Sequence, residues 1–386
     1  MEKNNILDKI YRELAESLNI SKTMSDEVVS SYEAVGKYLG NLEKNLDIKI
    51  FPQGSLSLGT VVRPIEGDVE GEYDVDLVCL LENGSSLSAK EIKNIVGDRL
   101  KESNRYNKMI DKEGKRCWTL QYSGFHMDVL PSVPLNVKIP FDEQSKNTKI
   151  RITHKNDYNE YLDKQSDPKA YREWFIQEME QTFNKNRQFL AESRNVEIEK
   201  IKLSQLRTPL QMAIQILKRH RDVLFSGRKH KPISIIITTL AAKAYNGEEN
   251  LFEAIRNILT NMDKYIEVDN SGNVMICNPT MKSENFADKW IEEPLKKEAF
   301  YRWLSQAKKD IVENPLQFTE GMGVMKNNMR TIYGTRAVNE SFDNYTMKNL
   351  KDRDNGMLGV TNNGNIVPIE NTSVVAPLKE HTFYGK

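Results

Sequence analysis

Three aspartates in apolar segments are the residues of this sequence best suited to chemistry. Asp74 and Asp76 lie two apart in YDVDLV (residues 73–78), and Asp128 lies in FHMDVL (residues 125–130). The alternating apolar residues indicate strands, and side chains two apart on a strand share one face. A turn at Ser123-Gly124 makes residues 117–122 and 125–130 a predicted hairpin that brings Asp128 beside the other two aspartates.

Three carboxylates on one face repel one another unless a cation neutralises them. Mg²⁺ takes oxygen ligands and leaves room for substrate phosphates. Two such ions about 3.5–4 Å apart can clamp the attacking and leaving oxygens of a phosphoryl displacement. We therefore expect Asp74, Asp76 and Asp128 to be catalytic residues that hold two Mg²⁺ ions, with Mn²⁺ as an alternative. Solvated acids on strand faces are the competing interpretation, and the surrounding pattern disfavours it.

A Gly-Ser pair follows the strand predicted at residues 48–51. Glycine at position 54 lets the backbone approach a triphosphate closely, and a turn entering a helix offers N–H groups to an anion. The Ser55 hydroxyl can add a phosphate contact. Gly54 and Ser55 are therefore candidate nucleotide-binding residues, although an ordinary strand-to-helix turn explains this pair alone equally well.

Together, the Gly-Ser turn, the Asp-x-Asp pair and the third aspartate resemble the polymerase-beta-type nucleotidyltransferase superfamily. The segment FPQGS (residues 51–55), continuing to TVVRP (residues 60–64), is similar to the CD-NTases, bacterial relatives of cyclic GMP-AMP synthase and oligoadenylate synthase. The long spacing between Ser55 and Asp74 supports this narrower group. The resemblance implies an enzyme that condenses nucleoside triphosphates, ATP among them, into a cyclic di- or trinucleotide and releases pyrophosphate. It also implies bacterial antiviral signalling of the CBASS type.

The resemblance further implies a lysine and a serine that hold the donor triphosphate, and the best matches are Lys218 and Ser234. Residues 215–231 independently carry six cations against one acid, Asp222. Such a cluster suits a triphosphate, but a solvated helix end with cations near its C-terminus is the alternative. Arg63 either reaches phosphate or pins the loop before Pro64. His220 is expected at the surface.

Composition excludes several other functions. The 55 basic and 55 acidic residues give no net charge, which argues against a general nucleic-acid binder and against a DNA activator. No apolar run is long enough for a membrane span, and three widely spaced cysteines favour a reducing, cytoplasmic location. The rival functions are an RNA-tailing or small-molecule nucleotidyltransferase and a nucleotide-binding module without catalysis.

The elements that must position these residues indicate an α+β fold. We expect a mixed-sheet nucleotidyltransferase lobe packed with long N-terminal helices (residues 1–150), then a helical-bundle lobe (151–320) and a polar C-terminal tail (321–386). Periodic apolar residues predict helices at residues 6–20, 25–46, 88–103, 168–192, 204–225, 233–245 and 286–312.

The last residues carry one more expectation. The chain ends in HTFYGK (residues 381–386), which resembles tails that ubiquitin-like ligase partners conjugate to targets in some CD-NTases. Lys386 follows Gly385, so conjugation through the glycine requires trimming first. A frayed terminus without a role is an equally good interpretation.

Overall fold

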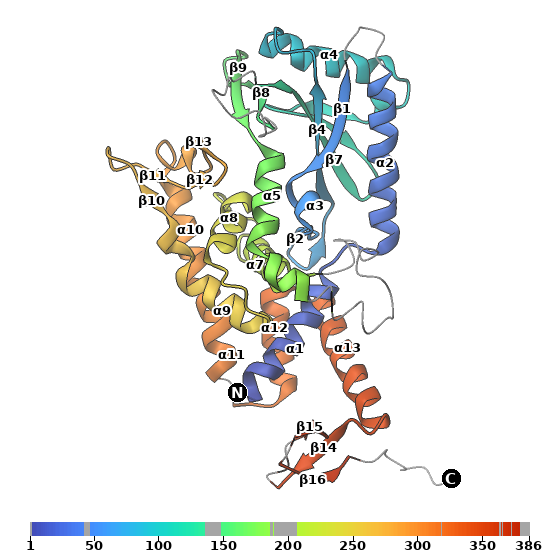
Figure 1. The fold of residues 1–386 in the computed structure, drawn as a ribbon, viewed down its shortest axis with the longest axis vertical. Helices are drawn as coiled ribbons and strands as arrows, with labels where there is room; N and C mark the ends of the chain where they lie inside the picture. Colours follow the sequence, from blue (N-terminus) through green and yellow to red (C-terminus); the bar gives the residue numbers. More distant parts are fainter. Residues whose placement is uncertain are drawn as a thin grey trace.

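The computed structural model describes residues 2–41, 47–135, 148–185, 188, 207–317, 319–362, 364, 366–371 and 373–378. Figure 1 shows a sheet lobe at one end of the long axis and a helical lobe beyond it. A last helix and a small sheet project from the helical lobe. The expected tail at residues 381–386, with Gly385 and Lys386, lies outside the described residues.

A seven-stranded mixed sheet forms the first lobe. The strand order is β1-β4-β7-β6-β5, and β8 and β9 continue the sheet from β7. Only β4 and β7 pair in parallel; the other neighbouring strands are antiparallel. The bounds are β1 Ile48–Gln53, β4 Tyr73–Leu81, β5 Ile110–Glu113, β6 Trp118–Gln121, β7 Phe125–Pro134, β8 Ile150–Lys155 and β9 Tyr161–Ser166.

Helices α2 (Lys22–Gly40) and α4 (Ala89–Glu102) cover one face of this sheet. Ser21 caps α2, and Ser88 forms a capping box with Glu91 on α4. The face that they cover carries Val75, Leu77 and Val129, which belong to one apolar core. Strand side chains alternate, so the aspartates lie on the opposite face, as the sequence predicts.

The helical lobe is built around α7 (Pro209–Leu224), which is buried along almost its whole length. Helix α1 (Glu2–Ser17) packs against α7, α9 and α13 and so belongs to this core, although it begins the chain. The other helices are α5 Pro168–Glu178, α8 Ser234–Ala244, α9 Leu251–Asn261, α10 Pro294–Ala307, α11 Asn314–Gln317, α12 Met322–Tyr333 and α13 Thr335–Asp354. The predicted α+β class, with a helical lobe after the sheet lobe, is confirmed.

Short elements complete the fold. Helix α3 (Gly54–Leu58) follows β1, and a hairpin of β2 (Ile65–Glu66) and β3 (Val69–Glu70) connects α3 to β4. Two further hairpins, β10–β11 and β12–β13, lie between α9 and α10; their strands are Glu267–Val268, Val274–Met275, Cys277–Asn278 and Met281–Asn285. Single turns of 3₁₀-helix lie at Tyr106–Lys108, Met262–Tyr265 and Asp288–Trp290.

Two sequence-based expectations about the helices are wrong. The single helix at residues 286–312 is instead a 3₁₀ turn, α10 and a π-helix at Lys308–Glu313, because Pro294 fits only the first turn of a helix. The segment after residue 320, for which no elements were predicted, forms α12, α13 and a three-stranded sheet. The strands of that sheet are β14 Leu358–Thr361, β15 Ile366–Pro368 and β16 Val374–Pro377.

Helix α12 was not predicted from the sequence because it has few apolar residues, but these few lie on one face of the helix. Met325, Met329 and Tyr333 are spaced four apart and bury one stripe against the helical core. The division of the chain at residues 150 and 320 stays a prediction. None of the helices in the described part of the chain combines the length and apolar character of a membrane span.

Candidate active site

The three aspartates lie on neighbouring strands. In the parallel pairing of β4 and β7, Asp76 is directly opposite Asp128, and Asp74 is opposite His126. Thr119, on β6 opposite Asp128, donates a hydrogen bond from its hydroxyl to Asp128 Oδ1 and so fixes that carboxylate. The expected hairpin of β6 and β7 therefore delivers Asp128 to the Asp-x-Asp pair.

Mutual repulsion is visible in the acidity of these groups. Burial, and then the negative charges of Asp128 and Asp74, raise the pKa of Asp76 to about 7, although Lys218 opposes the shift. Desolvation by the surrounding protein and the charge of Asp128 also raise the pKa of Asp74. The Asp74 side chain is itself 75% exposed, so water screens much of the repulsion there.

The arrangement fits a divalent cation that arrives with its substrate. Among the described residues, no group of three or more His, Cys, Asp or Glu side chains, the three aspartates included, forms a ready-made metal site. Mg²⁺ does not need one, because it keeps water ligands and takes others from substrate phosphates. Asp74, Asp76 and Asp128 would hold the ion, and its charge would relieve the repulsion that raises their pKa values.

Gly54 lies against the Asp76 carboxylate. Its φ of 58° is left-handed, and a Cβ at this position would collide with Asp76 Oδ2. Gln53 pairs with Asp76 in the sheet, so the strand-to-helix turn and the Asp-x-Asp strand are in direct register. Ser55 is the second residue of α3, and its carbonyl accepts from the Thr60 N–H at 2.9 Å. The predicted Gly-Ser turn therefore borders the carboxylates.

A cleft of about 890 Å³ opens over this face, between the sheet lobe and the helical lobe. Gly54, Asp76 and Asp128 line one side of it. The opposite walls come from the segment before α8, from β9 and from the β12–β13 hairpin, with Lys231, Ser166 and Glu284 among their residues. This cleft brings the aspartate face and both lobes together.

Lys218 is 4% exposed and is not among the residues that line the cleft. Its Nζ donates to the Thr60 carbonyl at 3.1 Å and to the Thr60 hydroxyl at 3.2 Å. Burial and the positive Arg221 lower its pKa to about 7, while Asp222 and Asp76 oppose the shift. A solvated helix end does not describe Lys218, Arg219 and Arg221, which are buried on α7, whereas Arg228, Lys229 and Lys231 lie past the end of the helix and are exposed. The role of Lys218 in triphosphate binding stays a prediction.

Ser234 begins α8 and is held by the same helix. Arg221 donates to Ser234 Oγ at 2.7 Å and to the Pro232 carbonyl at 3.2 Å. Asp222 orients Arg221 and also pairs with Lys231 at 3.2 Å. The Ser234 hydroxyl accepts from Arg221, and Ser234 is not among the residues that line the cleft, so its contact with a phosphate stays a prediction.

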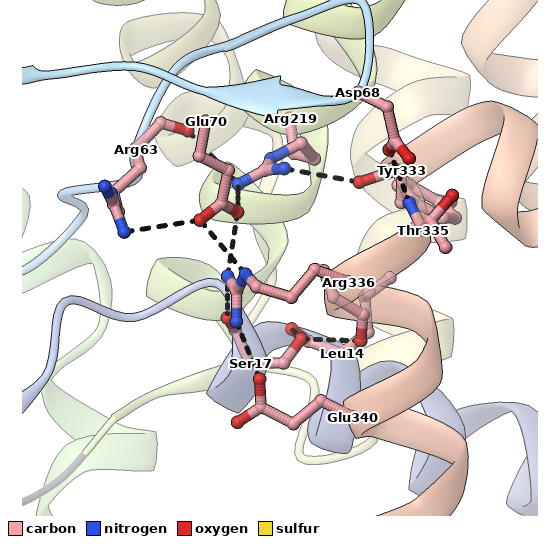
Figure 2. A network of polar contacts seen from close by, with 11 residues as sticks. Leu14, Ser17, Arg63, Asp68, Glu70, Arg219, Tyr333, Thr335, Arg336 and Glu340 are labelled. Atoms are coloured by element: carbon pink, nitrogen blue, oxygen red, sulfur yellow. Dashed lines mark hydrogen bonds and ion pairs between the residues drawn. The ribbon is translucent and has the colours of Figure 1, made fainter.

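Arg63 belongs to a polar network away from the cleft walls. It lies 3.5 Å from Glu70, which also binds Arg219 and Arg336 at 2.7 Å each (Figure 2). Arg63 therefore pins its own loop, one of the two roles considered from sequence; phosphate contact stays a prediction. The expectation of a surface His220 is wrong, because this side chain is 2% exposed and pairs with Asp310 at 3.1 Å.

Sequence reasoning missed most of the cleft's other residues. His126, which does not line the cleft itself, lies 2.8 Å from Glu72 and 3.8 Å from Asp74. Several cations also line the cleft: Lys115, Arg116, Lys164, Lys231, Lys289 and Lys296. Apart from Lys231, they come singly or in pairs from distant segments, so no local cluster in the sequence marks them.

Comparisons with known proteins agree with this geometry. The profile of the Second Messenger Oligonucleotide or Dinucleotide Synthetase domain matches residues 6–178. The c-di-GMP synthase of Roseivirga ehrenbergii is 28% identical over 388 residues, which cover 98% of this chain and 97% of that protein. The cyclic dinucleotide synthase CdnG of Bradyrhizobium diazoefficiens is 25% identical over 317 residues, covering 77% and 73%.

The solved structure of that CdnG in complex with GTP has the same fold. It superposes with a TM-score of 0.67 at 22% identity, and the match covers 88% of this chain and 99% of the other. The shared lobes, the aspartate face and the similarity to cyclic dinucleotide synthases lead to one assignment: residues 6–178 form a Second Messenger Oligonucleotide or Dinucleotide Synthetase domain, and the chain as a whole is similar to the CD-NTase nucleotidyltransferases.

Proposed function

We propose that the enzyme joins nucleoside triphosphates into a cyclic dinucleotide and releases pyrophosphate. The observation that carries this proposal is the face formed by Asp74, Asp76 and Asp128, set against Gly54 at one side of a cleft. A c-di-GMP synthase is similar over nearly its full length, and a cyclic dinucleotide synthase is similar over 73% of its length. A nucleotide-joining reaction needs this set of groups.

Different residues bind the donor triphosphate and accept the proton in this proposed reaction. Backbone N–H groups at Gly54 and Ser55, with Lys218 and the Ser234 hydroxyl, bind the donor triphosphate. Asp128 accepts the proton of the acceptor ribose hydroxyl, whose oxygen attacks the donor α-phosphate while pyrophosphate leaves. The linear product then turns over in the same cleft, and a second attack closes the ring. Divalent ions, when bound by the aspartates, neutralise the charge that develops on the phosphate oxygens.

GTP is the substrate best supported by the relatives. One relative is named for c-di-GMP, and the CdnG structure holds GTP. We therefore propose guanine in the product; the expectation of ATP among the substrates stays a prediction. An antiviral signalling role, two Mg²⁺ ions and a ubiquitin-like ligase acting on the C-terminal tail are further proposals from the family resemblance.

Product analysis tests the reaction directly. Purified protein would be incubated with each nucleoside triphosphate, alone and in pairs, with Mg²⁺ or EDTA. Phosphatase treatment followed by mass spectrometry should reveal a phosphatase-resistant cyclic product that contains guanine and disappears with EDTA. A product that phosphatase fully degrades, or extension of an added RNA in place of cyclisation, would favour the rival transferase chemistry.

A further inference from the structure

One wall of the cleft holds a carboxylate that the proposed reaction does not use. Glu284 lies on β13 and lines the cleft. It accepts hydrogen bonds from Asn278 Nδ2 at 2.8 Å and from Ser166 Oγ at 3.3 and 3.4 Å. Both donors also line the cleft. The group is therefore a positioned carboxylate at the surface of the nucleotide cavity.

Asn278 holds this carboxylate rigidly. The Asn278 side chain is 2% exposed, and its Oδ1 accepts from the Thr280 N–H at 3.0 Å and from the Thr280 hydroxyl at 2.9 Å. These two bonds fix the amide orientation, so its N–H₂ must face Glu284. A carboxylate offers about four acceptor sites, and the two neutral donors leave some of them open.

Unlike the nearby Asp288, Glu284 does not form an ion pair within the described ranges. Asp288 lines the same cleft but pairs with Lys164 at 3.4 Å. Within the described ranges, Glu284 has no ion-pair partner within 4 Å, and its partners are neutral donors. Burial raises its pKa, and its hydrogen bonds and Arg116 oppose that shift. An unpaired carboxylate that is partly desolvated favours a ligand that brings N–H donors.

We propose that Glu284 binds the Watson–Crick edge of guanine and selects GTP over ATP. Guanine presents N1–H and N2–H₂ side by side, two donors that match the two oxygens of a carboxylate. Adenine presents N6–H₂ beside the N1 lone pair, which a carboxylate repels. Uracil and cytosine each place an acceptor next to their one donor group. This inference rests on the proposed function, because it names the base that the same cleft takes.

An aromatic ring beside Glu284 suits the flat face of a base. Phe286 lies two residues further along the chain and also lines the cleft. Its ring packs edge-to-face on Tyr171, with centroids 6.1 Å apart, which fixes its orientation. Bases stack on such rings without sequence preference, so Phe286 would add affinity while Glu284 supplies the choice of base.

Binding measurements test the inference without requiring turnover. The affinities of non-hydrolysable GTP and ATP would be compared, with Mg²⁺, for wild type, Glu284→Gln and Glu284→Asp. Wild type should prefer the GTP analogue, and Glu284→Gln should reduce that preference by about tenfold or more, the range for a lost charged hydrogen bond. Glu284→Asp, which keeps the charge, should retain part of it. Glu267→Gln makes the same chemical change on β10, outside the cleft, and should keep the wild-type preference.

The outcomes separate the two proposals. Unchanged GTP preference in Glu284→Gln, or equal loss of GTP and ATP affinity, would overturn the role of Glu284 even if a cyclic guanine product forms. If Glu284→Gln loses the preference for GTP but the wild-type enzyme makes no cyclic product, the contact between Glu284 and guanine stands and the proposed reaction is rejected. Thermal melting shows whether Glu284→Gln is folded. If it is not, the GTP and ATP affinities of Glu284→Asp test the role of Glu284 instead: an unchanged GTP preference in that variant would overturn it.

Discussion

At the scale of single residues, the site combines like charges that the fold alone does not neutralise. Burial of the Asp76 carboxyl, and then the negative charges of Asp128 and Asp74, raise its pKa to about 7. Lys218 is the nearby cation, yet its own pKa is also about 7 and its Nζ already binds Thr60. Under the proposed function, a bound cation and triphosphate would offset the repulsion on this face.

The first prediction concerns the charge of Asp76. Because its pKa is higher in the folded than in the unfolded protein, the carboxyl opposes folding increasingly as pH rises from about 4 to 7. In metal-free protein, Asp76→Asn should melt a few degrees above wild type at pH 8, with a difference that shrinks towards pH 4. Thermal melts across this range measure it. The variant should make no cyclic product, and wild-type turnover would refute the metal assignment.

The second prediction separates binding from chemistry. Lys218→Ala removes a charged donor and should raise the KM for triphosphate by about 10- to 150-fold, equivalent to roughly 1.5–3 kcal/mol. Asp128→Asn should instead lower kcat, because it removes the proposed proton acceptor. Steady-state kinetics with each variant measure both parameters. An unchanged KM in Lys218→Ala would move the donor site to other cations of the cleft, such as Lys231.

At the scale of elements, the sequence predicted most of what carries the aspartates. The strand pattern around Asp74 and Asp128 was unambiguous because apolar residues alternate in both. The sequence pattern could not reveal the parallel register that places Asp76 opposite Asp128. It also could not reveal that α7 is buried on every side. It missed Glu284 and Asn278 as well, because the short β12–β13 hairpin leaves no periodic signal. Long-range packing decides all of these.

The third prediction tests the turn between β1 and α3. Gly54→Ala strains a left-handed backbone and drives a methyl group into Asp76, so it should lose most activity as well as some stability. Gly67→Ala is the matched control: its φ is 63°, but nothing lies within 4 Å of the added methyl group. Both variants should lose about 1 kcal/mol of unfolding free energy from strain. Equal activities in the two variants would exclude a role for close contact at Gly54.

At the scale of the whole molecule, Glu70 joins distant parts of the chain. It lies on β3 and binds Arg219 of α7 and Arg336 of α13, and Arg336 also donates to the Ser17 carbonyl at the end of α1 (Figure 2). Asp68 on the same hairpin accepts from the Thr335 N–H at 2.8 Å. The segment after residue 320, which the sequence suggested was a tail, therefore closes the helical lobe against the hairpin that precedes β4.

The fourth prediction follows from the unequal burial of these partners. Arg219 is 1% exposed, so Glu70→Ala would leave it charged and unpaired and should cost about 3–5 kcal/mol of unfolding free energy. Arg336→Ala should cost far less, since the Arg336 side chain is 49% exposed. Denaturant unfolding of both variants gives the two values. Equal losses would contradict the unequal burial of the two arginines.

The same network predicts a dependence on pH. Burial opposes ionisation of Glu70, but hydrogen bonds from Arg336 and Arg219, with their charges, outweigh it and lower its pKa. A lowered pKa stabilises the fold above the unfolded value near 4.5, and this contribution is lost as pH falls through the folded value. The gap between wild type and Glu70→Ala should therefore be full at pH 7 and narrow below pH 4.5. A gap that is constant across this range would mean that packing around Glu70, and not its charge, joins α13 to the hairpin.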